Sequence, residues 1–229
     1  MTRLLAIESS AEACSVALYR DGEMHVFFEH APMRHAELLL PAVQSLLTKT
    51  GLALENLDAI AFGRGPGSFT SLRIGIGVVQ GLAWGAGLPV VPVSSLAAVA
   101  QDAVDTAGSG FSSICVAVDA RMQEVYTANF RCSSNGIVAL AGEERVCEPG
   151  LVRALADGPF IAAGNGFERF RELDQLASNA GECHPGIRPR AETICKLALD
   201  WLTRNEPLPA GMAQPVYVRN KVASKPGPG

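Results

Sequence analysis

The sequence lacks the patterns that mark metal-binding and secreted domains. Its six cysteines include no C-x-x-C pair and its four histidines include no H-x-x-x-H pair, so the spacing predicts neither a zinc site nor another metal centre. The opening residues, MTRLLAIE, hold too few apolar side chains for a secretory signal. We therefore expect no metal ion and no disulfide framework.

Charge of either sign is also scarce. Charged residues make up 18% of the 229 positions, and acidic residues outnumber basic ones 23 to 19. This balance excludes a broad basic surface for nucleic acid, so any contact with RNA is expected only through a partner. The segment 74–101 carries no charge, but glycines and prolines interrupt it repeatedly. We therefore expect no membrane-spanning helix and a cytoplasmic protein.

Apolar residues, by contrast, are abundant at 48% of the chain, which is enough to bury a large core in one domain or two small lobes. Alternating and apolar runs in the first half predict three strands followed by alternating helices and strands. The strands are expected at residues 3–9, 14–20, 23–30, 59–63 and 89–93, and the helices at 34–50, 68–86 and 94–106. This order predicts an α/β fold with a mixed sheet and helices packed on it.

The second half begins again in the same way, with strands expected at residues 113–119, 124–131 and 137–140. A helix at 149–156, a strand at 160–164 and a helix at 191–204 are expected to follow. The pattern indicates a weak internal duplication. It predicts an N-terminal lobe at 1–107, a C-terminal lobe at 111–206 and an extended tail at 207–229.

Two acidic residues, Glu8 and Asp119, close the first strand of their respective halves. One superfamily of phosphotransferases builds an ATP cleft from such a duplicated unit, in which the turns approach the phosphates and the acids hold a metal ion. The candidate nucleotide-binding residues on these turns are Glu8, Ser9, Ser10, Asp119 and Arg121. The alternative is that both acids are solvated turn residues, and the two acids alone favour that alternative.

A glycine-rich run, GRGPGSFT at residues 63–70, joins a predicted buried strand to a predicted helix. Backbone N–H groups of such a turn, beside the positive end of a helix, can bind an anion. Gly65 and Gly67 are therefore added to the possible nucleotide-binding residues. The run lacks the lysine of a P-loop and the spacing of a dinucleotide fingerprint, so its specificity is limited.

The two longest predicted helices are more apolar than one core face requires. Apolar residues cover about 200° of the helix at 34–50, where one core face needs about 100°. In the helix at 68–86, Gly77, Gly81 and Gly85 recur at every fourth position and form a ridge that permits close packing. The excess favours a subunit interface, with the chain's own core as the alternative. The candidate interface residues are Leu38, Leu39, Ala42, Val43, Leu46, Arg73, Ile74, Gly77, Val78 and Gly81.

Three runs together resemble the TsaB (YeaZ) family: AIESS at 6–10, GRGPGSFTSLRIG at 63–75 and VDARMQEVY at 118–126. The likeness extends nearly end to end and includes PVYVRN at 215–220. Two positions depart from the family pattern, since Ser71 replaces a usual glycine and Gln123 a usual small residue.

This resemblance implies an actin-like ATPase (ASKHA) fold of two lobes and a role in adding threonylcarbamoyl to the adenosine beside the anticodon in tRNA. In that family a paralogue, TsaD, performs the chemistry with an H-x-x-x-H metal pair, and an ATPase, TsaE, completes the assembly. The equivalent positions here are Ser95 and Val99, neither of which offers a nitrogen ligand.

The resemblance therefore implies a non-catalytic scaffold that forms a homodimer in isolation, a heterodimer with TsaD, and contacts tRNA only in the complex. We expect no cofactor beyond weak nucleotide binding. The alternative is a stand-alone ATP-dependent phosphotransferase that uses Glu8 and Asp119. A metallopeptidase is excluded by the missing ligands.

Overall fold

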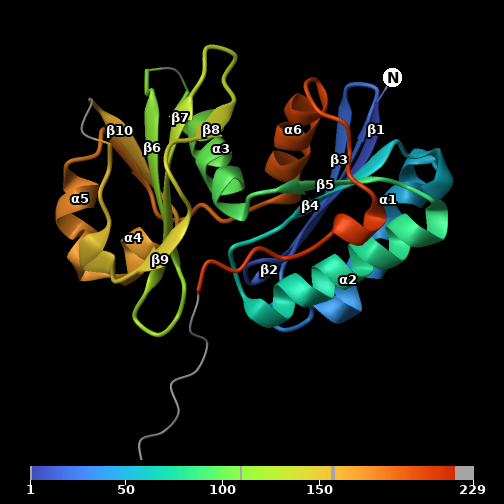
Figure 1. Ribbon diagram of the computed structural model, residues 1–229, viewed down its shortest axis with the longest axis horizontal. Helices are drawn as coiled ribbons and strands as arrows, with labels where there is room; N and C mark the ends of the chain where they lie inside the picture. Colours follow the sequence, from blue (N-terminus) through green and yellow to red (C-terminus); the bar gives the residue numbers. More distant parts are fainter. Residues whose placement is uncertain (1, 109, 156–157, 220–229) are drawn as a thin grey trace, which may run out of the picture.

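The computed structural model describes residues 2–108, 110–155 and 158–219, which form two lobes side by side (Figure 1). The sheet of the first lobe has the order β3-β2-β1-β4-β5. Its strands are β1 (Arg3–Glu8), β2 (Ala13–Arg20), β3 (Glu23–His30), β4 (Ala59–Gly63) and β5 (Val90–Val93). β1, β2 and β3 pair antiparallel, whereas β4 and β5 extend the sheet in parallel from β1.

The sheet of the second lobe has the order β11-β10-β6-β7-β8, and β9 pairs with the first residues of β7. Its strands are β6 (Ser113–Asp119), β7 (Val125–Cys132), β8 (Val138–Leu140), β9 (Arg145–Cys147), β10 (Phe160–Ala163) and β11 (Glu182–His184). As in the first lobe, the opening pair β6 and β7 is antiparallel and the later strand β10 joins β6 in parallel. The duplication read from the sequence pattern is therefore present in the pairing of the strands.

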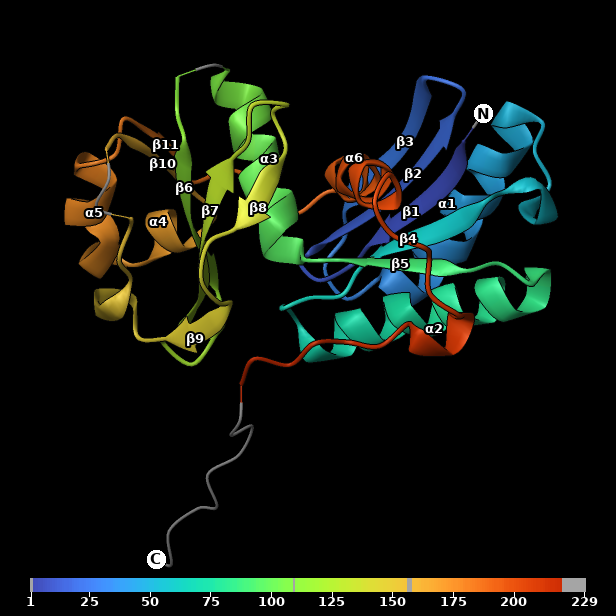
Figure 2. The ribbon, with the colours of Figure 1, turned by 45° about the horizontal axis from the view of Figure 1, so that its top comes forward.

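Three of the four long helices carry a recognisable sequence signal at one end. α1 (His35–Thr50) and α2 (Phe69–Ala86) each end at a left-handed glycine, Gly51 and Gly87. α3 (Ser95–Ala107) begins at Ser94, whose hydroxyl accepts the N–H of Ala97. α6 (Ala191–Leu202) is amphipathic, and the short helices α4 (Gly166–Arg169) and α5 (Asp174–Ser178) cover the outer face of the second sheet (Figures 1 and 2).

The lobes share one core because each sheet is covered on its inner face by a helix from the other half of the sequence. α3 packs on β6, β7, β8 and β10 of the second sheet, α6 packs on β1, β2, β4 and β5 of the first sheet, and the two helices pack on each other. Their buried side chains join one cluster with both sheets. Figure 2 shows α3 and α6 lying between the two sheets. The boundary between the lobes at residues 107–111 therefore stays a prediction, because α3 and α6 each pack on the sheet formed by the other half of the chain.

Structure and expectation agree for most elements. The α/β fold class with two lobes of mixed sheet and flanking helices is confirmed. The helix expected at 149–156 is wrong, because only a 3-10 turn, Pro149–Leu151, forms there and Val152 is already extended; residue 156 lies outside the described residues. β9, β11, α4 and α5 were not predicted.

Among the described residues, no helix combines the length and the apolarity needed to cross a bilayer. The tail is irregular up to residue 219 apart from a β-bridge of Leu208 to Val90 and a 3-10 turn at Ala210–Met212. Similar turns lie elsewhere at Leu54–Asn56 and Arg171–Leu173. The rest of the expected tail, 220–229, lies outside the described residues.

Candidate functional site

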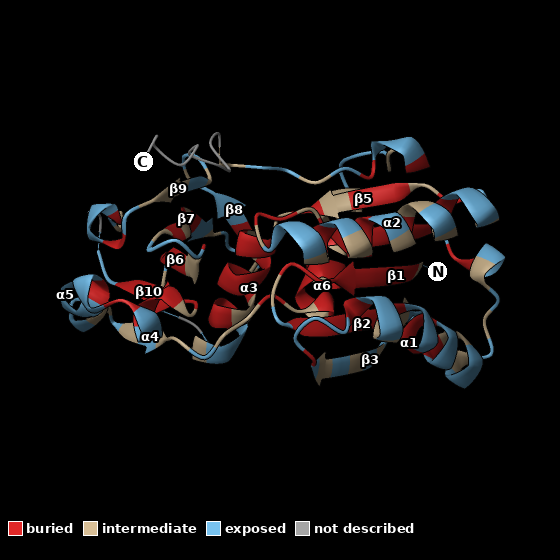
Figure 3. Cartoon of the chain, turned by 90° about the horizontal axis from the view of Figure 1, so that it is seen from below, coloured by how far each residue is buried: buried red, intermediate tan, exposed pale blue. Residues whose placement is uncertain are grey.

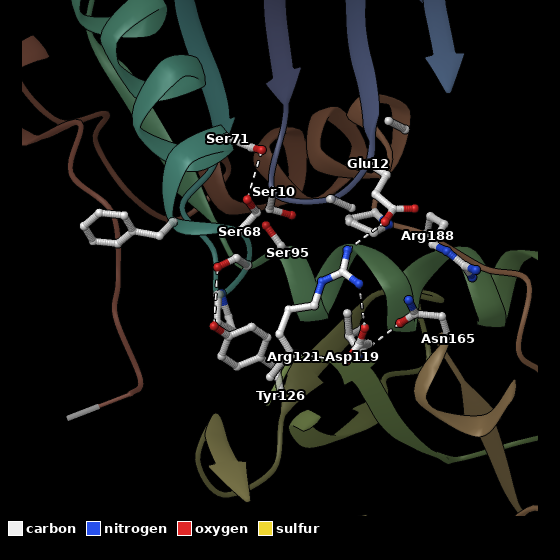
Figure 4. A pocket seen from close by; sticks show the side chains of 18 of the residues that line it. Ser10, Glu12, Ser68, Ser71, Ser95, Asp119, Arg121, Tyr126, Asn165 and Arg188 are labelled. Carbon is white, nitrogen blue, oxygen red and sulfur yellow. Dashed lines mark hydrogen bonds and ion pairs between the residues drawn. The ribbon is translucent and has the colours of Figure 1, made fainter. Parts of the chain in front are cut away.

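A cleft of about 630 Å³ lies between the lobes, where the turns that follow β1 and β6 face each other. Figure 4 shows Ser10 and Glu12 from the first turn opposite Asp119 and Arg121 from the second. The start of α2, with Ser68 and other polar residues, lines a further wall. The structure thus brings together the two turns that the sequence singled out.

Glu8 lies beneath this cleft and is almost fully buried. Its Oε1 accepts the backbone N–H of Ser10 at 2.5 Å and its Oε2 accepts the hydroxyl of Ser95 at 2.8 Å. Desolvation by burial raises the pKa of Glu8 above 4.5, and these hydrogen bonds oppose part of that rise. Both carboxylate oxygens are therefore engaged within the protein.

We expect this burial to make stability depend on pH. Because the folded state holds the Glu8 proton more tightly than the unfolded state, its contribution is fully present below the unfolded pKa of about 4.5 and is lost as pH rises through the raised folded pKa. Glu8→Gln cannot titrate, so its free energy of unfolding should fall less than that of the wild type over this range. Urea denaturation at several pH values measures the difference, and parallel profiles would contradict the expectation.

The glycine-rich run serves the protein's own packing around the turn after β1. A Cβ on Gly63 would lie 1.9 Å from Oε2 of Glu8, and a Cβ on Gly67 would lie 2.5 Å from the backbone oxygen of Ser10. The N–H of Ser68 is donated to that same Ser10 oxygen at 2.8 Å. Gly63 thus makes room for the Glu8 side chain, and Gly67 lets its loop touch the backbone of Ser10. An anion-binding role for Gly65 and Gly67 stays a prediction.

Asp119 is held by cationic side chains in the second lobe. Its side chain is 5% exposed, and its Oδ2 lies 3.4 Å from Arg121 and 3.3 Å from Arg169. Its Oδ1 accepts the backbone N–H of Arg121 at 2.9 Å. Asn165, from the start of α4, accepts the N–H of Asp119 at 2.9 Å. The acid is therefore part of an ion-pair network and not a solvated turn residue.

Arg121 continues this network across the cleft. Its guanidinium reaches Glu12 in the first lobe at 2.8 Å, as the dashed line in Figure 4 shows. The other arginines that line the cleft also have carboxylate partners, Arg188 with Glu168 at 3.5 Å and Arg219 with Glu124 at 2.5 Å. The positive charge around the cleft is thus already balanced, which disfavours a polyphosphate there.

The candidate interface residues fall into three groups by burial (Figure 3). Four of them lie on the buried face of α1 and belong to the chain's own core: Leu39, Ala42, Val43 and Leu46. Three are half-buried against the same core: Leu38, Ile74 and Val78. Three are exposed on α2: Arg73, Gly77 and Gly81. The apolar excess of α1 is therefore partly core packing, and the surface that remains open lies mainly on α2.

The open part of α2 is a ridge of bare backbone. A Cβ added to Gly77, Gly81 or Gly85 would meet no atom within 4 Å. Trp84 is 66% exposed beside this ridge. No other part of the described chain covers the ridge, so a second polypeptide could pack directly against the backbone of α2.

Ser95 and Val99, the two positions equivalent to the metal-binding pair of TsaD, have structural roles in this chain. Ser95 holds Glu8, and Val99 is fully buried in the shared core. The part of the chain that the structure describes contains no group of three His, Cys, Asp or Glu side chains placed to hold a metal ion. His35, at the start of α1, is buried, and its Nε2 lies 3.2 Å from the carbonyl oxygen of Ala13.

Comparison with known proteins agrees with this arrangement. The chain is 40% identical over 233 residues to "tRNA threonylcarbamoyladenosine biosynthesis protein TsaB" of Escherichia coli, with 99% of each chain covered. It is 35% identical to the protein of the same name from Haemophilus influenzae, covering 99% of this chain and 97% of the relative. The chain belongs to the TsaB family.

A solved structure and a family model extend this finding. YeaZ from Pseudomonas aeruginosa matches with a TM-score of 0.88 and 41% identity, covering 95% of this chain and all of the other. The family model described as "TsaD: tRNA N6-adenosine threonylcarbamoyltransferase" matches residues 26–181. This TsaB-family chain and TsaD are therefore related in sequence.

Sequence reasoning missed several residues that shape the cleft of this TsaB-family protein. Glu12 and Asn165 carried no motif of their own, and their roles arise only because the two lobes face each other. Glu144 likewise joins the lobes, since it pairs with Arg64 at 3.0 Å and bonds to Ser94. Periodicity gives no signal for such contacts, because their partners are far apart in the sequence.

Proposed function

We propose that this chain is a non-catalytic partner of a TsaD-type paralogue in the biosynthesis of threonylcarbamoyladenosine in tRNA. Full-length relatives are named for this pathway. The observation that carries the non-catalytic role is the state of the two cleft acids. Glu8 is bound by Ser10 and Ser95, and Asp119 is paired with Arg121 and Arg169, so neither presents a free carboxylate for a metal ion or a substrate proton.

We further propose that α2, with the half-buried side chains beside it, is the surface through which the chain associates. The bare ridge of Gly77 and Gly81 allows a partner helix to approach closely, and Trp84 beside it provides a large aromatic anchor. The same surface would form a homodimer in isolation and a heterodimer with the TsaD-type paralogue, with TsaE joining the complex. An interface of about 1,600 Å² in total would hold such a pair.

The alternative function, an ATP-dependent phosphotransferase, is favoured by one observation. The cleft has a volume suited to a small molecule and lies between the two acid-bearing turns. Against it stand the engaged acids and the carboxylate partners of the arginines that line the cleft. Binding of a triphosphate would require these ion pairs to break.

Reconstitution tests the two functions together. The chain, its host's TsaD-type paralogue and TsaE are combined with tRNA and the threonylcarbamoyl donor, and each component is left out in turn. We expect modified adenosine only when this chain and the paralogue are both present. The lone chain should not bind tRNA below micromolar Kd at physiological salt, because acids outnumber bases 23 to 19.

The same protein preparations also show whether the proposed function is wrong. ATP turnover by the lone chain at about 1 s⁻¹ or faster, abolished by Glu8→Ala or Asp119→Ala, would support the phosphotransferase. Full modification in the absence of this chain would show that it is not a required partner.

A further inference from the structure

The described part of the tail runs from the first lobe to the second across the lower side of the molecule (Figure 2). It first pairs with β5, where Leu208 and Val90 exchange backbone hydrogen bonds of 2.7 and 2.8 Å, and then contacts α2 and the glycine-rich loop. Gln80 of α2 donates its side-chain amide to the carbonyl oxygen of Ala213 at 2.8 Å, and the N–H of Val216 is donated to the carbonyl oxygen of Arg64 at 2.8 Å. This backbone bond fixes the path of the tail beside the first lobe.

An aromatic cluster then anchors the tail to the start of α2. The rings of Tyr217 and Phe69 lie 5.4 Å apart, and Arg73 lies 3.8 Å above the Phe69 ring. Arg73 also donates its Nε–H to the hydroxyl of Tyr217 at 3.0 Å. Stacking of this kind stabilises beyond the area it buries.

Two residues later the tail contacts the second lobe. Arg219 donates to Oε2 of Glu124 at 2.5 Å and to the carbonyl oxygen of Ala120 at 3.1 Å, and its other terminal nitrogen lies 3.5 Å from the sulfur of Met122. The Arg219 side chain is 16% exposed. A single guanidinium thus contacts three residues of the turn that follows β6.

That turn is under backbone strain. Arg121, Met122 and Gln123 have φ values of 63°, 53° and 60°, a left-handed conformation that residues with a side chain seldom adopt in succession. The turn is closed by bonds from the N–H of Glu124 to the carbonyl oxygen of Arg121 and from the N–H of Ala120 to that of Glu124. Surrounding contacts must hold such a turn in place, and Arg219 supplies several of them.

We propose that residues Ala213–Arg219 form a strap that holds the strained turn and thereby keeps Arg121 in its ion pair with Glu12 across the cleft. When the strap is docked, the two lobes are joined by this pair. When it is released, the turn relaxes and the carboxylates of Glu12 and Asp119 lose their shared arginine. The strap is therefore a conformational device that sets whether Arg121 spans the cleft in a charge pair or leaves the two acids facing it unpaired with each other's lobe. It exists in the free chain and does not depend on the proposed partnership.

Amide hydrogen exchange of the free, full-length chain, read residue by residue, tests the strap. The reporting amides are those of Ala120 and Glu124, whose bonds close the turn. Arg219→Gln removes the direct contact and should raise exchange at both by at least about tenfold. Tyr217→Ala removes only the anchor on α2, and it should raise exchange at the same two amides in the other lobe.

The matched control is Met212→Ala, in the same tail but 55% exposed, which should leave both amides unchanged. If Arg219→Gln has no effect on the turn, the proposal is wrong. If Arg219→Gln acts but Tyr217→Ala does not, Arg219 is a local clamp and there is no strap. An equal rise at buried amides of β1 and β6 would indicate general destabilisation and would also overturn the proposal.

Discussion

Gly67→Ala is expected to destabilise the protein by about 3 kcal/mol, near the upper end for an inserted methyl group. The added Cβ would lie 2.5 Å from the backbone oxygen of Ser10 and 2.6 Å from its Cβ. Neither loop can yield easily, because the N–H of Ser68 is bonded to that same oxygen. For a chain of this length such a loss lowers Tm by about 6–12 °C, which denaturant and thermal unfolding both measure.

Gly77→Ala is the matched control for this substitution. It introduces the same methyl group into the interior of α2, where nothing lies within 4 Å. Alanine favours a helix over glycine by about 0.8–1 kcal/mol, so this variant should be more stable than the wild type. If both variants lost the same stability, close packing around Ser10 would not be the reason that glycine occupies position 67.

Gly81→Glu is expected to weaken capture of the TsaD-type paralogue by at least about a hundredfold, which corresponds to about 3 kcal/mol. Gly81 is exposed and open in the free chain, so the carboxylate stays solvated and folding is unaffected. In the complex the same charge would be buried without a partner, which carries a large desolvation cost. Titration of the paralogue against each variant measures the affinity, and light scattering reports the homodimer.

Gly150→Glu makes the same chemical change at an exposed, open glycine of the second lobe, and it should leave affinity unchanged. Position 81 serves this test better than Leu39 or Val43, because those side chains are buried in the chain's own core and their loss would unfold α1. Undiminished capture by a folded Gly81→Glu variant would place the association surface elsewhere.

Much of the fold follows from the sequence because local signals and packing agree. Gly51 and Gly87 end helices, Ser94 begins one, and the β2–β3 hairpin forms at Asp21 and Gly22 as its turn residues indicate. The helix expected at 149–156 does not form, because Val152 is extended and packs in the core of the second lobe. Tertiary packing sets the conformation of this segment, and the pattern of neighbouring residues gives no signal for it.

The sequence predicts where the candidate site lies, but not which contacts its charged side chains make. The acids at the ends of β1 and β6 do face one cleft, as the duplicated pattern implied. Their engagement could not be read from the sequence, since Glu8 is held by Ser95 and Arg121 by Glu12, residues that lie 87 and 109 positions away. The burial of Leu39 and Val43 likewise depended on which side of α1 faced the sheet. An apolar count over a helix cannot separate core from interface.

The exchange of helices between the lobes has a consequence for synthesis on the ribosome. The first sheet is complete once residue 93 has been made, yet one of its faces stays uncovered until α6, Ala191–Leu202, has emerged. At about 5–20 residues per second, the remaining length delays that helix by several seconds. During this interval the apolar side chains of β1, β4 and β5 lack their native cover, and the nascent chain is open to chaperones and to misassembly. Since neither lobe can close its core alone, the whole chain is expected to fold late and as one unit.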